Sequence, residues 1–390
     1  MPSYPGAVPL LAPKNLHELV RTAFNRARAS GDVNFYPTQA AVLAVNSVPF
    51  QLRFAPSLAN KPKGAPLPPP QHNASPSPAK PFDPFDNPPT PLLITSLGAS
   101  HILVLNKFAV VPEHAIVATR AFAPQTHLLA PADLAAVYAC IDAYDREEEG
   151  GQLFAFFNSG THSGASQPHR HVQLLPVERM RDGLPDTHTS SSSSGGGDGE
   201  TGGSAGVEWT DVLANGLLDE NTRTRLPFRT FAQRIRNSGS PAPDADALHA
   251  AYLALYSQAC AAVSPHGHHH DVDGIIQEEG EARISYNLAM TRDAMVVVPR
   301  LAEGGEITVP SSPASASGGG GGGGATPRKT IGKLALNGTV LAGTALVKSA
   351  AEWDALRQDP GQVLNILARI GVPWENDGGG APPSSPLSSL

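Results

Sequence analysis

Apolar residues recur along the chain at two spacings, one typical of helices and one typical of strands. Leu16, Val20 and Phe24 repeat at helical spacing, and Gly31 follows them as a C-terminal stop signal. Pro131 suits the first turn of a helix, where its missing N–H is not needed. The helical spacing predicts five helices, over residues 13–30, 131–146, 244–263, 351–357 and 360–370.

Short apolar runs, some of them alternating with polar residues, predict strands. They cover residues 42–54, 101–108, 114–120, 153–157, 171–176, 283–290 and 294–299, with a strand-like end over 334–348. The predicted strands over 283–290 and 294–299 are separated by only a few residues, so we expect them to form a hairpin that turns at Arg292-Asp293. Together the runs predict an α+β fold, in which helices pack on an antiparallel sheet.

Proline interrupts these patterns over residues 62–91, which we expect to form a loop or a surface wrap. Its Pro81-Phe-Asp-Pro-Phe85 element would pin such a wrap with two aromatic side chains. A partly disordered linker is the alternative interpretation.

Segments rich in Ser and Gly divide the rest of the chain. We predict flexible insertions over residues 187–206 and 311–326, and a disordered tail over 376–390. The predicted domains are an N-terminal domain over residues 1–186 and a C-terminal domain over 207–375. Both halves are expected to contribute to one site.

Composition restricts the class of protein. The 390 residues are 41% hydrophobic and 16% charged, which is enough for one large or two ordinary domains with a core. The net charge of -7 argues against a general nucleic-acid binder. We see neither a secretory signal nor an apolar run of about 18 residues. We therefore expect no membrane partner and a cytoplasmic location, with a nuclear one left open. The chain is expected to be a monomer or small homo-oligomer.

The two cysteines and one histidine cluster could bind metal or undergo redox chemistry, but a structural interpretation is favoured for each. Cys140 and Cys260 each lie in a helical pattern, and we expect them to be buried thiols rather than a disulfide. The His266-Gly-His-His-His270 cluster follows a predicted helix, where a polar loop is favoured over a metal site.

The most distinctive segment runs from Asn158 to Gln173, between two predicted strands. Its loop is rich in small and polar residues, and His169, His171 and Gln173 then alternate, so they should share one strand face. Loop N–H groups can hold phosphate oxygens, and an imidazole with a reference pKa of ~6.5 can be a neutral nucleophile near pH 7. A metal site remains the alternative for a pair of histidines.

This segment resembles the histidine-triad superfamily, in the variant whose third His is replaced by Gln. It is most similar to the fungal-type diadenosine tetraphosphate phosphorylases, also called ATP adenylyltransferases. Galactose-1-phosphate uridylyltransferases share the His-x-His-x-Gln pattern, but they typically have Pro where this chain has Arg170. Further resemblances lie in Ser57–Pro62, Leu105–Phe108, Val111–His114, Ser285–Thr291, Val298–Arg300, Asn337–Thr339 and Gly343–Lys348. Gly338 and Thr344 depart from the yeast-like members, which carry Ser and Met there.

The resemblance implies a histidine-triad-like sheet whose site is completed by the C-terminal half. It implies cleavage of diadenosine tetraphosphate by inorganic phosphate to ATP and ADP, through an adenylyl intermediate on His171. His169 would orient or polarise the site, and Gln173 would bond the bridging or leaving oxygen. The implied substrate-binding residues are Lys61, Asn106, Lys107, Asn158, Ser163, Gly164, Ala165, Ser166, Gln167, Asn337, Gly338, Thr339, Thr344 and Lys348.

The same resemblance implies a divalent cation, expected to be Mg²⁺, that arrives with the polyphosphate, and no organic cofactor. Gly160 and Gly164 would allow the backbone to approach a phosphate closely.

Three rival functions stay open at this point. The first is a dinucleoside polyphosphate hydrolase or another nucleotidyltransferase of the same superfamily. The second is a binding protein that senses dinucleoside polyphosphates without catalysis. The third is a metal-binding protein that uses His169, His171 and the cluster at His266–His270.

Overall fold

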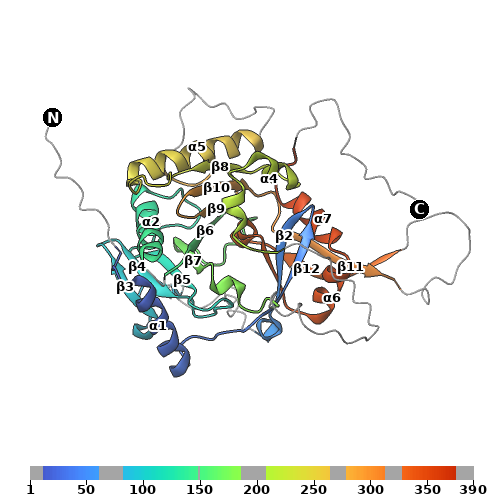
Figure 1. Ribbon diagram of the computed structural model, residues 1–390, viewed down its shortest axis with the longest axis horizontal. Helices are drawn as coiled ribbons and strands as arrows, with labels where there is room; N and C mark the ends of the chain where they lie inside the picture. Colours follow the sequence, from blue (N-terminus) through green and yellow to red (C-terminus); the bar gives the residue numbers. More distant parts are fainter. Residues whose placement is uncertain are drawn as a thin grey trace, which may run out of the picture.

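An eight-stranded sheet forms the centre of the structure, a computed structural model that describes residues 12–60, 82–147, 150–185, 208–263, 278–311 and 327–374. The strand order is β3-β4-β5-β7-β6-β9-β10-β8, and all neighbouring strands pair antiparallel (Figure 1). The strands are β3 (Leu93–Leu97), β4 (His101–Leu105), β5 (Ala115–Thr119), β6 (Leu153–Ser159), β7 (His171–Pro176), β8 (Phe231–Arg234), β9 (Tyr286–Met290) and β10 (Ala294–Pro299).

Strands from both halves of the chain meet in the middle of this sheet. The strand β6, from the N-terminal half, pairs with β9 from the C-terminal half, so that Asn158 lies opposite Asn287 and Ser159 opposite Tyr286. The predicted Ser-rich boundary near residue 187 therefore separates two parts of the sequence that share one continuous sheet.

Three helices cover one face of the sheet, α1 (Leu16–Ser30), α2 (Pro131–Arg146) and α5 (Ala245–Val263). The helix α2 begins with Pro131, and the backbone N–H of Ala130 donates to the carboxylate of Asp133 at 2.7 Å, which satisfies a helix-end donor. The alternation of strand side chains supplies the apolar surface beneath these helices, including Phe157, Leu174 and Met295.

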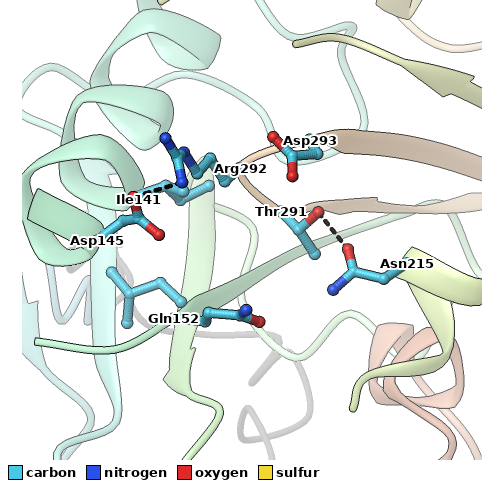
Figure 2. Close-up of a pocket in the computed structure, with 8 residues that line it drawn as sticks. Ile141, Asp145, Gln152, Asn215, Thr291, Arg292 and Asp293 are labelled. Atoms are coloured by element: carbon cyan, nitrogen blue, oxygen red, sulfur yellow. Dashed lines mark hydrogen bonds and ion pairs between the residues drawn. The ribbon is translucent and has the colours of Figure 1, made fainter. Parts of the chain in front are cut away.

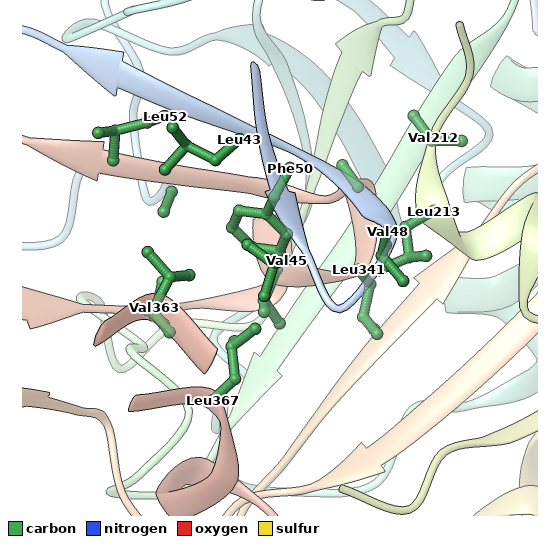
Figure 3. Packing of buried hydrophobic residues seen from close by; sticks show 14 of the residues in the cluster. Leu43, Val45, Val48, Phe50, Leu52, Val212, Leu213, Leu341, Val363 and Leu367 are labelled. Atoms are coloured by element: carbon green, nitrogen blue, oxygen red, sulfur yellow. The ribbon is translucent and has the colours of Figure 1, made fainter. Parts of the chain in front are cut away.

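The other face carries a second core, built largely from the C-terminal half. Its parts include the three-stranded sheet β1-β2-β13 and the β11–β12 pair, packed with α6 and α7 (Figures 1 and 3). Phe154 and Phe156 of β6 belong to this core, whereas Leu153, Ala155 and Phe157 belong to the helical side. The bounds are β1 (Gln39–Val45), β2 (Val48–Phe54), β11 (Gly304–Pro310), β12 (Arg328–Ala335), β13 (Thr344–Val347), α3 (Leu213–Gly216), α4 (Glu220–Arg225), α6 (Ala350–Gln358) and α7 (Gly361–Ile370).

The structure confirms the α+β class and most of the predicted elements, and it corrects two of them. The single strand predicted over 42–54 is a hairpin, because Asn46 and Ser47 have φ of 49° and 63° and turn the chain between β1 and β2. The strand-like stretch 334–348 is divided among the end of β12, a 3₁₀ helix over Gly338–Ala342 and β13. The strands β3, β8 and β11 and the short helices α3 and α4 were not predicted. Other 3₁₀ helices span Pro56–Asn60, Thr90–Leu92 and Arg179–Arg181.

Several predictions concern residues outside the described ranges. They are the Ser/Gly insertion at 187–206, residues 62–81 of the proline-rich stretch, residues 312–326, the His266–His270 cluster and the tail at 376–390. Cys140 and Cys260 form no disulfide with each other, as predicted, but only Cys140 is buried and Cys260 is half-buried. Burial raises the pKa of the Cys140 thiol to about 12. Among the helices that can be described, none is long and apolar enough to cross a bilayer.

Candidate active site

Polar side chains gather on one face of the sheet, between two apolar clusters. One cluster includes Phe156 and Val298, and the other places Phe85 over β4 and β5. The rings of His169 and His171 both contact Phe85, with centroids 5.5 and 5.2 Å apart. On the opposite face, Arg170 donates to Asp133 of α2 at 2.8 Å. The predicted alternation of the His-x-His segment is therefore confirmed.

His171 has the tautomer that a nucleophile needs. Its Nδ1 lies 2.8 Å from the backbone oxygen of His169, so Nδ1 carries the proton and Nε2 keeps its lone pair. The residue is only 5% exposed. Burial lowers the pKa of its imidazole, more than the hydrogen bond to His169 raises it. A neutral ring at pH 7 with a lone pair on Nε2 can attack phosphorus.

His169 has protein partners at both ring nitrogens. Its Nδ1–H donates to Asp83 Oδ2 at 2.7 Å, and the hydroxyl of Thr119 lies 2.9 Å from Nε2. The ring is 1% exposed. In this arrangement His169 acts on His171 through its backbone carbonyl, which fits an orienting role. Asp83 had no sequence signal of its own, although the Phe-Asp-Pro-Phe element around it was noted.

A third histidine, His114, joins this group; it ends the Val111–His114 segment but was not among the predicted site residues. Burial lowers its pKa to about 4, against the effect of a hydrogen bond with the side chain of Gln173. Asn106 Nδ2 lies 3.2 Å from His114 Nδ1, while Asn106 Oδ1 accepts from the N–H of Phe108 at 2.9 Å. The structure therefore links Asn106 to Gln173 through His114.

The turn before His114 is held in an unusual backbone conformation. Glu113 has φ of 62°, a left-handed value that a non-glycine residue seldom adopts. Its buried carboxylate accepts from Arg179 at 2.8 and 3.0 Å and from the hydroxyl of Tyr144 at 3.3 Å. The Pro-Glu-His turn was recognised in the sequence, but the contacts of Glu113 that hold it were not predicted.

Lys107 directly follows Asn106 in the sequence and has an exposed side chain.

The loop after β6 is fixed by amides. Asn158 Oδ1 accepts from the N–H of Gly338 at 2.8 Å and from Asn287 Nδ2 at 2.9 Å. The same Nδ2 donates to the backbone oxygen of Ser163 at 2.9 Å. The Ser163 hydroxyl is buried, donates to Gly160 O at 2.7 Å and accepts from the N–H of Ala165 at 3.3 Å. Ser163 therefore shapes the loop from inside.

The other loop residues lie closer to the surface. Ala165 and Ser166 are exposed, and Gln167 is half-buried. Gly164 has φ of 78°, and a Cβ there would lie 2.8 Å from the Cβ of Asn337. Gly160 packs as closely on Ser285, where an added Cβ would lie 2.3 Å from the hydroxyl. In the structure these two glycines bring the loop against C-terminal segments.

Of the C-terminal residues predicted to bind substrate, Asn337 and Gly338 meet the loop. Asn337 caps the 3₁₀ helix, since its Oδ1 accepts from the N–H of Thr339 at 3.0 Å. A Cβ at Gly338 would lie 2.7 Å from the ring of Phe156, which fills the space a Ser side chain would need. Thr344 is buried in the three-stranded sheet, and the exposed Lys348 precedes α6, with its N–H 3.1 Å from Glu352. Their contacts do not join them to the histidines.

Arg300 supports the loop from behind and was predicted only as core. It is fully buried, donates to Asn287 Oδ1, and bonds the backbone oxygens of Leu336, Ala302 and Glu303 at 3.0 to 3.1 Å. Burial lowers the pKa of its guanidinium to about 10, which leaves it charged at neutral pH. The hairpin β9–β10 thus adds a buried cation beneath the loop.

One further feature is separate from this site. A polar crevice contains the Asp145–Arg292 ion pair of 2.9 Å and the Thr291–Asn215 bond of 2.7 Å (Figure 2). It lies beside Gln152, near the start of β6, whereas Asn158 lies near the end of that strand. Lys61 lies outside the described residues. Within the described ranges, His, Cys, Asp and Glu do not gather in threes that could hold a metal ion.

Comparison with known proteins extends over both halves. Residues 7–186 match the Ap4A phosphorylase N-terminal domain, and residues 224–373 match the ATP adenylyltransferase C-terminal domain. The chain is 25% identical over 376 residues to Protein APA1 of Saccharomyces cerevisiae, covering 93% of this chain and 95% of that protein. It is 25% identical over 382 residues to diadenosine 5',5'''-P1,P4-tetraphosphate phosphorylase 2 of the same yeast, covering 92% and 95%.

Solved structures show the same fold. The crystal structure of yeast Ap4A phosphorylase Apa2 in complex with Ap4A has a TM-score of 0.61 at 23% identity, covering 93% of this chain and 99% of that one. The complex of the same protein with AMP gives 0.62 at 23% identity, covering 95% and 100%.

Proposed function

The chain belongs to the Ap4A phosphorylase family of nucleotidyltransferases, and we propose that His171 carries out its phosphorolysis of diadenosine tetraphosphate (Ap4A) to ATP and ADP. The observation that supports this assignment is the bond from His171 Nδ1–H to the carbonyl of His169. It leaves the Nε2 lone pair on the polar face of the sheet. The core around β4 to β7 would then be histidine-triad-like.

Two displacements account for the products. In the first, Nε2 of His171 attacks the α-phosphorus of one adenosine, and the bond from that phosphorus to its bridging oxygen breaks. ATP leaves, and AMP remains bound to the imidazole. In the second, an oxygen of inorganic phosphate attacks the same phosphorus, and the P–N bond breaks. ADP leaves, and His171 returns neutral. Two easier steps replace one difficult step, which is the advantage of a covalent intermediate.

We assign Gln173 and the loop to stabilising the negative charge that shifts among the phosphate oxygens during the transfer. Gln173 follows His171 by two residues on the same face, so its amide can bond the bridging or leaving oxygen. Backbone N–H groups of the loop at 163–167 would hold phosphoryl oxygens as their charge shifts. Asn106 and Asn158 would assist these loop groups in holding the substrate. Asn158 Oδ1 is occupied by Gly338 and Asn287, so its role toward the substrate is to place the loop.

Cations would balance the polyphosphate. We assign Lys61, Lys107 and Lys348 to this role, with Thr339 and Thr344 shaping the segment before Lys348. A Mg²⁺ ion would be held mainly by phosphate oxygens and water. In agreement with this, the carboxylates of Asp83 and Glu113 near the histidines are already engaged by His169 and Arg179. When bound, the ion would neutralise part of the leaving group's charge.

Product analysis tests the proposed function. The protein would be incubated with Ap4A and Mg²⁺, with and without inorganic phosphate, and the nucleotides separated by chromatography. We expect ATP and ADP in equal amounts, and only when phosphate is present. ATP and AMP without phosphate would make the protein a hydrolase, and binding without turnover would make it a sensor.

A further inference from the structure

The strands β6 and β7 stop pairing just where the site begins. Their register runs from Leu153 opposite Pro176 to Phe156 opposite Gln173, and continued by two residues it would place Asn158 opposite His171. That pair is absent from the ladder between these two described strands. Asn158 begins the loop, and His171 is the proposed nucleophile, so the point of separation sets the width of the site.

The side chain of Gln125 occupies this gap. Its Oε1 accepts from the backbone N–H of His171 at 2.8 Å. Its Nε2 donates to the backbone oxygen of Asn158 at 2.8 Å and to that of His171 at 3.2 Å. Gln125 is 2% exposed, and its own N–H donates to Pro168 O at 2.8 Å, so its position is fixed from both ends. One amide thereby replaces the missing ladder bonds.

The chemistry of these bonds requires a side-chain amide. The site offers one backbone donor and two backbone acceptors, and a neutral amide matches them with one oxygen and one NH₂ group. A carboxylate could accept from His171 but could not donate to either carbonyl. An apolar side chain of the same length would leave all three groups buried without a partner, which proteins avoid.

We propose that Gln125 is a positioning residue of the nucleotidyl transfer, which sets the separation between His171 and the loop that begins at Asn158. This inference rests on the proposed role of His171. Gln125 holds both the N–H and the C=O of His171, so it fixes the backbone from which the imidazole extends. It thereby fixes where Nε2 stands relative to a phosphorus held by the loop.

The substitution that tests this is Gln125→Met, compared with Gln362→Met. Gln362 is also buried, and its Oε1 accepts from the N–H of Thr308 at 2.9 Å, in the second core. We expect Gln125→Met to lower kcat by about 10- to 100-fold with KM changed less than about threefold, since misplaced reacting groups cost rate rather than binding. Gln362→Met should also lower Tm, by less because it removes one backbone bond rather than three, and should leave kcat within about twofold.

A second variant, Gln125→Glu, adds a pH signature. The ionised carboxylate repels two carbonyl oxygens, whereas the protonated acid regains a donor. Its kcat relative to wild type should therefore rise as the pH falls from 8 toward 5.5. A profile parallel to the wild type, or a Gln125→Met enzyme with unchanged kcat, would overturn the proposal.

The tautomer of His171 separates this inference from the proposed function. In protein labelled with ¹⁵N-histidine, the imidazole signals identify the protonated nitrogen, and the His171→Asn spectrum assigns them. We expect Nδ1–H in the wild type and a mixture of tautomers in Gln125→Met. If the wild type does not cleave Ap4A but this change is seen, the substrate assignment fails and the positioning role stands. An unchanged His171 signal contradicts the positioning role whatever the substrate.

Discussion

The strand β7 and the hairpin β9–β10 place polar side chains on the same face of one sheet, but their partners differ. On β7, Nδ1 of His171 is bonded to the His169 carbonyl and the Gln173 side chain is bonded to His114, while Nε2 of His171 lies on the polar face of the sheet. Asn287 and Arg300 of the hairpin are fully buried and bonded to protein groups. Under the proposed function, the N-terminal half would supply the reacting groups and some of their supports, such as Gln125, whereas the C-terminal half would supply supports alone.

The largest expected effect is at His171, the proposed nucleophile on β7. His171→Asn should lower kcat by a factor on the order of 10³ or more, as removal of a nucleophile does in other enzymes. Tm should fall only modestly, because the change removes the ring contact with Phe85 but leaves the pairing of β7 with β5 and β6 in place. His249→Asn, on the distant helix α5, is the matched control. Residual activity close to wild type in His171→Asn would place the nucleophile elsewhere.

Asn287→Leu should instead reduce stability and activity together. It removes the partner of Asn158, of the Ser163 carbonyl and of the Arg300 guanidinium, which leaves a buried charge poorly satisfied. We expect the free energy of unfolding to fall by about 2–4 kcal/mol, measured by urea denaturation. Asn215→Leu, which removes an amide near the other end of the sheet, should cost less. A large loss of kcat at unchanged stability would make Asn287 a reacting group and break the comparison.

Acid should act on both stability and rate through the buried imidazoles. Burial lowers the pKa of His171 and lowers that of His114 to about 4, so below pH ~6.5 the unfolded chain binds protons that the folded chain does not. Stability is therefore full above pH ~6.5 and falls between there and about 4, by on the order of 3 kcal/mol for His114. His114→Leu should flatten this dependence in denaturation curves. In wild type, kcat/KM should stay constant down to pH ~6.5, and a decline that begins above it would contradict a neutral His171.

Asp83 tests a second support in the N-terminal half, beside Gln125. Asp83→Ala removes the carboxylate that holds His169 Nδ1, and we expect kcat to fall about tenfold at nearly constant KM. Asp83→Asn keeps an acceptor and should lose less. Asp359→Asn, in an exposed pair with Arg328, serves as the control. Equal kcat in Asp83→Ala, Asp83→Asn and Asp359→Asn would show that catalysis does not require the Asp83 carboxylate at His169.

The smallest expected effect concerns exposed cations. Lys107→Ala and Lys348→Ala should each raise KM for Ap4A by about two- to fivefold at low ionic strength, since exposed charges contribute up to about 1 kcal/mol. The difference from wild type should shrink in 0.5 M salt. Lys329→Ala, exposed on β12, should leave KM unchanged. An effect that persists in high salt would indicate a direct, desolvated contact.

The sequence predicted groups whose arrangement is local and missed those that depend on distant contacts. The alternation of His169, His171 and Gln173 follows from strand geometry alone. The Asn46-Ser47 turn was missed because it has neither Gly nor Pro. Gln125 gave no signal, because it lies 46 residues from its partner His171.

Arg300 illustrates a different limit. An arginine at the end of an apolar strand could face solvent, so its burial cannot be deduced from the pattern. Its partners become visible only when Asn287 and Leu336 are placed beside it. Gly338 likewise looked like a departure from related sequences, and the ring of Phe156 supplies the reason for it.

The pairing of β6 with β9 has a consequence for synthesis on the ribosome. The strand that leads into the loop is made early, whereas the partner of Asn158 follows 129 residues later. Until β9 emerges, β6 is an open sheet edge, and such edges invite pairing with other chains. We therefore expect the nascent N-terminal half to expose this edge until β9 has been made.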